Sequence, residues 1–244
     1  MQRAIILAIC GFVLALVAQL PARWIGPLLP HAMHCRQLDG SAWRGSCSGL
    51  TTASGALGDL TWDVHTLQLL RGRLELRLEL TNPGGYVRGV LGMGLGGALH
   101  GRDVTLDLPL TSTLVNSLPA GAHARLTGTL SRFDWNGKFL DALQGELDIL
   151  DFTGSQGQSL GSYRAKFAPD ATTDASGPPT GVVHDLGGPL ALDATLQLTR
   201  DPGYVLQGRV AARPSAPPEL ADQLKYLGSP DTSGRRPFSL SGTF

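Results

Sequence analysis

Charged residues are scarce in this chain of 244 residues, and neither sign is in excess. Lys and Arg total 20, Asp and Glu also total 20, and together they make up 16% of the sequence, below the ~25% of an ordinary globular protein. No block of basic residues interrupts this balance. Proteins that bind nucleic acid cluster Lys and Arg to neutralise phosphates. The composition therefore argues against nucleic acid as a partner.

Cysteine is also rare, with three residues in the whole chain. Cys10 lies inside an apolar run, whereas Cys35 and Cys47 flank a turn-rich stretch around Asp39-Gly40-Ser41. In an oxidising compartment Cys35 and Cys47 can pair, and a disulfide that closes so short a loop adds ~2–4 kcal/mol of stability. The alternative is two unrelated buried thiols. We expect the disulfide.

Long hydrophobic runs are limited to one, Ala4–Leu20, which follows Arg3 and contains no charge. A membrane span needs ~20 residues (range ~17–25). Arg23 and Trp24 follow the run and are typical of a membrane–water interface. The alternative is a cleaved signal peptide, but the sites ending at Ala18 and Ala22 carry Leu where a small residue is preferred. We expect residues 1–25 to be a retained membrane anchor and residues 26–244 an exported domain.

Beyond that run, glycine is abundant, at 32 residues, and leucine alternates with polar residues. In Arg73–Leu80 every second residue is leucine and every residue between is charged, which places four leucines on one face of a strand. The same alternation recurs in later segments, which turn signals separate: 104–108, 124–130, 147–149, 190–198, 204–210 and 238–244.

This pattern predicts an all-β body, a large antiparallel twisted sheet or meander folded on itself, preceded by one N-terminal transmembrane helix. Short helices are expected in two places only. Glu219–Leu227 carries leucines at positions 220, 224 and 227, which form one stripe. Thr111–Leu118 is the second. We see no linker that divides residues 26–244.

Motifs for chemistry are weak. Gly92–Gly97 matches G-x-G-x-x-G, but another strand pattern follows it instead of the helix that a dinucleotide requires. Gly45–Gly49 resembles a nucleophile elbow with Cys47 at its centre, without the strand-to-helix context of that motif. His31, His34 and Cys35 fall short of a four-ligand zinc site. We expect no catalytic residue, no metal and no cofactor, and a protein that is not an enzyme.

Several short segments, in this order and spacing, together resemble the type II secretion system protein N family. They are Leu20–Trp24, Gly40–Gly45, Leu60–Trp62, Leu160–Tyr163, Asp185–Leu190 and Leu240–Gly242. The resemblance covers nearly the whole chain. It implies a single-span inner-membrane protein with a periplasmic β domain and an accessory role in exporting folded proteins across the outer membrane. The family has no established catalytic residues, so none is carried over.

The leading hypothesis is a protein that works by docking to other secretion-system subunits, either the inner-membrane platform or the outer-membrane channel. A second hypothesis is an envelope protein that binds lipid or another hydrophobe in a β groove, since one face of a large sheet is lined with leucine. A third is an outer-membrane barrel, because Phe238, Leu240 and the terminal Phe244 resemble the last strand of such a protein.

Overall fold

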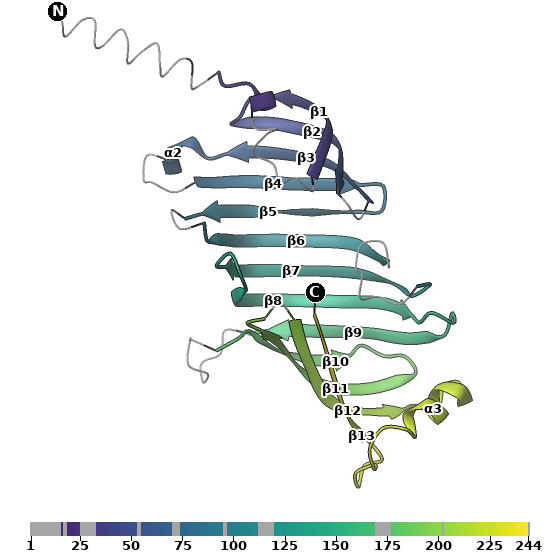
Figure 1. Cartoon of the computed structure of the whole chain (residues 1–244). Helices are drawn as coiled ribbons and strands as arrows, with labels where there is room; N and C mark the ends of the chain where they lie inside the picture. The colour runs from purple at the N-terminus through teal and green to yellow at the C-terminus, as the bar shows by residue number, and fades with distance from the viewer. Residues whose placement is uncertain are drawn as a thin grey trace, which may run out of the picture. The chain divides into compact units, whose positions relative to one another are not determined.

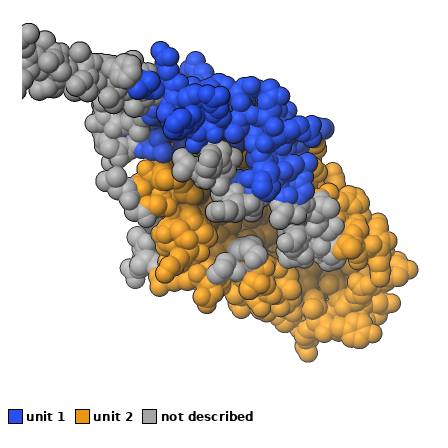
Figure 2. All heavy atoms as spheres, turned by 45° about the horizontal axis from the view of Figure 1, so that its top comes forward, with its two compact units in different colours: residues 1–83 blue, residues 84–244 orange. Residues whose placement is uncertain are grey.

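Figure 1 shows a computed structural model of the chain. It describes residues 16, 19–24, 33–52, 55–69, 74–94, 97–111, 120–168, 177–201 and 203–243. The chain divides into two compact units, residues 1–83 and residues 84–244, which Figure 2 colours blue and orange.

The first unit is a short antiparallel meander. Its strands pair in sequence order, β1 with β2, β2 with β3 and β3 with β4. Its elements are η1 (Ala22–Trp24), β1 (Met33–Gly40), β2 (Arg44–Thr52), β3 (Gly55–Val64), α2 (Thr66–Leu69) and β4 (Leu74–Asn82).

The second unit is a longer meander in which each strand again pairs antiparallel with the next. Its last strands turn across the direction of β7 and β8 (Figure 1). Its elements are β5 (Gly85–Met93), β6 (Leu99–Thr111), β7 (His123–Trp135), β8 (Leu140–Thr153), β9 (Ser159–Phe167), β10 (Thr180–Asp185), β11 (Leu190–Thr199), β12 (Gly203–Ala212), α3 (Pro218–Leu224) and β13 (Arg236–Thr243).

The tight turn between β10 and β11 shows why glycine is frequent. Gly187 and Gly188 have φ of 115° and 114°, a region that residues with a side chain rarely adopt. A Cβ at Gly188 would also lie only 2.7 Å from the Cα of Gly161 at β9. Glycine therefore permits both the turn and the close approach of the two backbones.

The all-β class and the antiparallel sheet are confirmed, and the strand expected over residues 73–80 is β4 at Leu74–Asn82. The helix expected over Glu219–Leu227 is α3. Of the expected Thr111–Leu118 helix, Thr111 ends β6 and the remainder lies outside the described residues. Most of Ala4–Leu20 also lies outside them. No described helix is both long and apolar enough to cross a membrane.

A small helix-capped core holds one end of the second unit together. Leu220 of α3 packs with Leu190 of β11 and Val210 of β12, and each of the three is less than 10% exposed. Four half-buried side chains surround them, those of Leu160, Leu224, Leu227 and Phe238. The leucine stripe of α3 therefore covers one end of the sheet's apolar side.

Candidate functional site

The two faces of the sheet in the second unit differ in chemistry, and the register of the strands sets the difference. On β10 and β11, Val183 pairs with Ala194 and His184 with Asp193, so that neighbouring residues point to opposite sides. One side, which we call the apolar face, carries Leu147, Ala165, Val183, Ala194 and their equivalents. The other, the charged face, carries Glu146, Lys166, His184, Asp193 and theirs.

The apolar face is hollowed into a groove of about 390 Å³. Apart from two tyrosines, the lining consists of leucine, isoleucine, valine, phenylalanine and alanine. The polar groups of its side chains are limited to the two tyrosine hydroxyls. The lining residues are Leu126, Leu147, Ile149, Phe152, Leu160, Tyr163, Ala165, Phe167, Val183, Leu190, Leu192, Leu196, Tyr204 and Leu206. They come from six consecutive strands, β7 to β12.

The hydroxyl of Tyr163 is already committed, since it donates a hydrogen bond to the carbonyl oxygen of Leu160. Burial raises the pKa of Tyr163 to about 12, and the neighbouring charge of Asp185 adds to the shift. The phenol therefore stays neutral at any physiological pH. The groove presents a surface that is uncharged and almost without hydrogen-bonding capacity.

A partly buried ion pair lies at the helix-capped end of the groove. Asp185 pairs with Tyr163 in register, and Arg213 reaches it at 2.6 Å. Burial alone would raise the pKa of Asp185, but hydrogen bonds from the Leu192 amide and from Arg213 outweigh it and hold that pKa below its usual value. Arg213 also donates to the carbonyl oxygens of Gly188 and Leu190, so the pair fixes the β10–β11 turn against the segment before α3.

The charged face carries a series of cross-strand ion pairs. Their closest N–O distances lie between 2.6 and 2.9 Å, and they join β6 with β7 and β8 with β9: Arg125–Asp107, Arg164–Asp148 and Lys166–Glu146. On β10 and β11 of the same face, His184 and Asp193 are joined by a hydrogen bond of 2.8 Å. Such pairs on an exposed surface contribute little to stability, ~0–1 kcal/mol each. In each ion pair one charge offsets the other.

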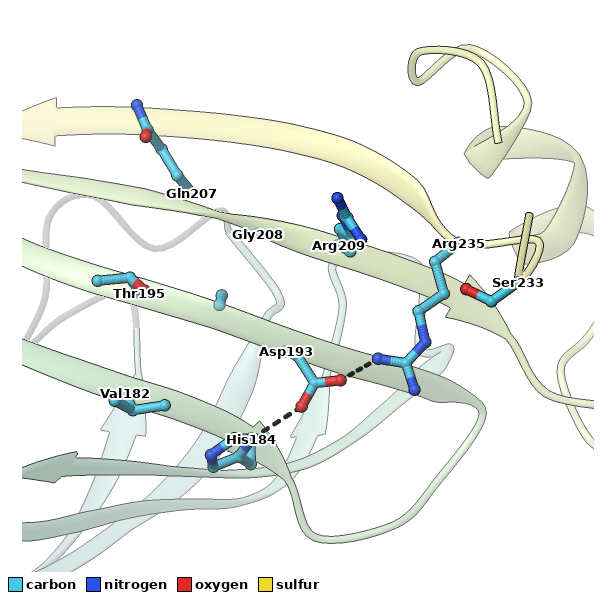
Figure 3. Close-up of a pocket in the computed structure, with 10 residues that line it drawn as sticks. Val182, His184, Asp193, Thr195, Gln207, Gly208, Arg209, Ser233 and Arg235 are labelled. Atoms are coloured by element: carbon cyan, nitrogen blue, oxygen red, sulfur yellow. Dashed lines mark hydrogen bonds and ion pairs between the residues drawn. The ribbon is translucent and has the colours of Figure 1, made fainter. Parts of the chain in front are cut away.

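A shallow polar recess of about 530 Å³ lies on this face (Figure 3). Asp193 stands between His184 and Arg235 and is bonded to both. The hydrogen bond from His184, followed by that from Arg235, holds the pKa of Asp193 below its usual value. The Ser233 hydroxyl donates to Asp231 and not to the imidazole, so these side chains do not form a nucleophile–base pair.

The candidate site residues considered from the sequence lie mainly in the first unit. Cys35 of β1 and Cys47 of β2 are joined by a disulfide with a Cα–Cα distance of 5.8 Å, and the Cys47 side chain is 2% exposed. Gly45–Gly49 therefore forms part of a strand, not an elbow. His34 lies on β1, while His31 is outside the described residues. No metal-binding cluster occurs among residues that the structure describes.

Arg23 and Trp24 belong to η1, which is tied to the body of the first unit. Pro21 forms a bridge with Ser41, and the Ala42 amide donates to the carbonyl oxygen of Leu20. Ala22 is 1% exposed, whereas Trp24 is 65% exposed. The indole of Trp24 is thus presented outward directly after the apolar run.

Further along the chain, Gly92–Gly97 spans the end of β5 and the connection to β6, a strand-to-strand context. Sequence reasoning overlooked β9 and β10, which supply Tyr163, Phe167 and Val183 to the groove. The signal for β9 was present, since Tyr163, Ala165 and Phe167 alternate with Arg164 and Lys166.

The outer strand β13 ends the meander. It pairs with β12 on one side, from Val210↔Arg236 to Gly203↔Thr243, and has no strand partner on the other within the described residues. Ser239, Leu240 and Ser241 are exposed. Residues 238–243 contain no charge and no proline, the features that usually block pairing at a sheet edge.

The chain is similar to known proteins over almost its full length. The family described as type II secretion system (T2SS), protein N, matches residues 31–239. The chain is 27% identical to a type II secretion system protein N of Vibrio cholerae, covering 93% of this chain and 92% of that protein. It is 27% identical to one of Aeromonas hydrophila, covering 97% and 95%. No solved structure matches the chain.

Proposed function

Because the chain belongs to the type II secretion system protein N family, we propose that it is a non-enzymatic accessory component of that system. Residues 1–25 anchor it in the inner membrane, and the β units stand in the periplasm. The family match over residues 31–239 is the observation that carries this proposal. The apolar run Ala4–Leu20 and the outward-facing indole of Trp24 support the anchor.

The mechanism that we propose is docking by strand addition at β13. An exposed sheet edge offers a row of backbone N–H and C=O groups, which an extended segment of a partner can pair with. β13 is eight residues long and carries no charged residue after Arg236. The partner is another secretion-system subunit, of the inner-membrane platform or the outer-membrane channel.

The edge is tested by adding charge to it. Ser239→Lys with Ser241→Lys places two lysines on β13, which disfavours pairing with a further strand. The control, Thr195→Lys with Gln207→Lys, adds the same charge to exposed positions of β11 and β12 on the same face. We expect the edge variant alone to lower secretion of a folded substrate while the protein's level in the membrane is unchanged. Equal secretion by both variants would contradict docking at β13.

The groove favours a second function, the binding of a hydrophobic ligand. Its continuous apolar lining is the kind of surface that holds small hydrophobic molecules, whose pockets usually measure ~300–1,000 Å³. This function is compatible with docking, because the groove and the outer backbone of β13 are different surfaces.

A further inference from the structure

We infer that the groove of the second unit holds one acyl chain of a membrane phospholipid. The inference rests on the proposed membrane anchor for the source of the ligand, and on the groove itself for the ligand's chemistry. The anchor and the ligand of the groove can be tested separately.

The lining excludes polar ligands. A sugar, a nucleotide or an extended peptide would bring hydrogen-bonding groups into the groove, and each group left unpaired there would oppose binding. The Tyr163 hydroxyl is already paired with Leu160, and the other lining atoms are overwhelmingly carbon. A methylene chain is the biological ligand that needs no hydrogen bond along its length.

An amphipathic helix of a partner protein is another occupant that an apolar groove can take. Photocrosslinking from a groove residue in intact cells distinguishes the two, because a helix would give a protein adduct and an acyl chain a lipid adduct.

The length of the groove suits an acyl chain. Its lining extends along β11 from Leu190 to Leu196, six residues or about 20 Å. At about 1.3 Å per bond along an extended hydrocarbon, that length takes on the order of 15 carbons.

Within the part of the chain that the structure describes, one end of the groove is closed and one side is open. Leu160 and Leu190 line it and also belong to the cluster under α3, so the helix blocks that end. On the open side, Leu206 lines the groove and pairs in register with Leu240 of β13, which is 52% exposed. The apolar surface thus continues from the interior to the edge strand, where a chain can enter.

The source of the chain follows from the anchor. If Ala4–Leu20 lies in the bilayer, phospholipids supply the most concentrated acyl chains in the membrane to which the protein is attached. Free fatty acid has the same chemistry, and the experiment includes it as a separate probe.

The test uses the full chain in vesicles of phosphatidylethanolamine and phosphatidylglycerol. These contain phosphatidylcholine that bears a photoreactive diazirine and an alkyne tag on one acyl chain. After irradiation, the modified residues are located by peptide mass spectrometry. We expect adducts on groove residues of β8, β9, β11 and β12. A parallel sample receives a free fatty acid with the same diazirine, and we expect weaker labelling there.

Variants locate the site. Ala165→Trp fills the groove and should lower labelling of its residues about tenfold. Val182→Trp adds the same side chain on the charged face, where Val182 is 48% exposed, and should leave labelling unchanged. Leu130 of β7 is 9% exposed and does not line the groove. Leu130→Ala therefore destabilises the unit without changing the lining and should keep labelling, which separates blockage from partial unfolding.

Several results would overturn the inference. These are equal labelling of both faces, labelling unaffected by Ala165→Trp, or labelling by free fatty acid only. Release of the chain from the vesicles would refute the proposed anchor instead. A chain that stays on the vesicles with an unlabelled groove would refute the groove's occupant alone.

Discussion

The two faces of the second unit are built from the same strands, yet one is a carbon-lined groove and the other a set of ion pairs. Val182 and Val183 make the contrast clear, since they are neighbours of the same residue type. Val183 is 8% exposed and lines the groove, while Val182 is 48% exposed beside the charged recess. We expect the apolar face to contribute most of the stability of the unit, because the exposed ion pairs of the charged face contribute only ~0–1 kcal/mol each.

The largest expected effect is the difference in stability between the same substitution at each of those two valines. Val183→Asp buries an unpaired carboxylate, which costs several kcal/mol, on the order of 3–5. Val182→Asp leaves the charge in water, and we expect a loss of no more than about 1 kcal/mol. Urea unfolding of the two variants measures the difference. Similar midpoints for both would show that the register of β10 assigned here is wrong.

A smaller effect is expected in the first unit, which the disulfide between Cys35 and Cys47 stabilises. Cys35→Ser or Cys47→Ser opens a loop of sequence separation 12, and we expect a loss of roughly 2–3 kcal/mol. The second unit should keep its stability, since it contains no cysteine. Thiol labelling of the denatured, unreduced chain should modify Cys10 alone. Labelling at Cys35 and Cys47 would contradict the disulfide and the periplasmic location together.

The smallest effect comes from the charged face. The pKa of Asp193 is lowered in the folded protein, so its contribution is present above the unfolded pKa, ~3.9, and is lost as the pH falls through the lower folded value. Because Asp193 is about half exposed, we expect less than ~1 kcal/mol.

Acid titration of Asp193→Asn against the native chain measures this contribution. The variant should lose less stability than the native chain as the pH falls below about 4, and the difference should shrink at high salt. A difference of several kcal/mol would mean that the charged face contributes substantially to the stability of the unit, contrary to our expectation.

Much of the fold was predictable because period-two alternation reports directly on strands with one buried face. Arg73–Leu80 and residues 190–198 correspond to β4 and β11 in this way. Strands such as β1 (Met33–Gly40) and β10 (Thr180–Asp185) lack a clear alternation of leucine with charge, and sequence reasoning did not find them. The division at residues 83 and 84 was not expected either, because a short Pro-Gly turn there looks like any other turn.

A hydrophobic face was predictable from the sequence, but the groove on it was not. Leucines on one face suggested a hydrophobic surface, but their number does not tell whether helices or a second layer of sheet cover it. Coverage depends on tertiary packing: α3 reaches Leu190 and Val210 and stops there, while Leu196 and Leu206 line the open groove. The disulfide was expected because two cysteines flanked a turn, and its partners lie on adjacent strands.

The most direct test of the central claim is photocrosslinking in intact cells from three positions of the chain. A diazirine amino acid of leucine's size replaces Leu196 in the groove, Thr195 on the charged face, or Ser241 on β13, and mass spectrometry identifies what each one captures. We expect phospholipid from position 196, a secretion-system subunit from position 241, and neither in quantity from position 195. The same products from positions 195 and 196 would contradict this expectation, because the two faces would then not differ in what they bind.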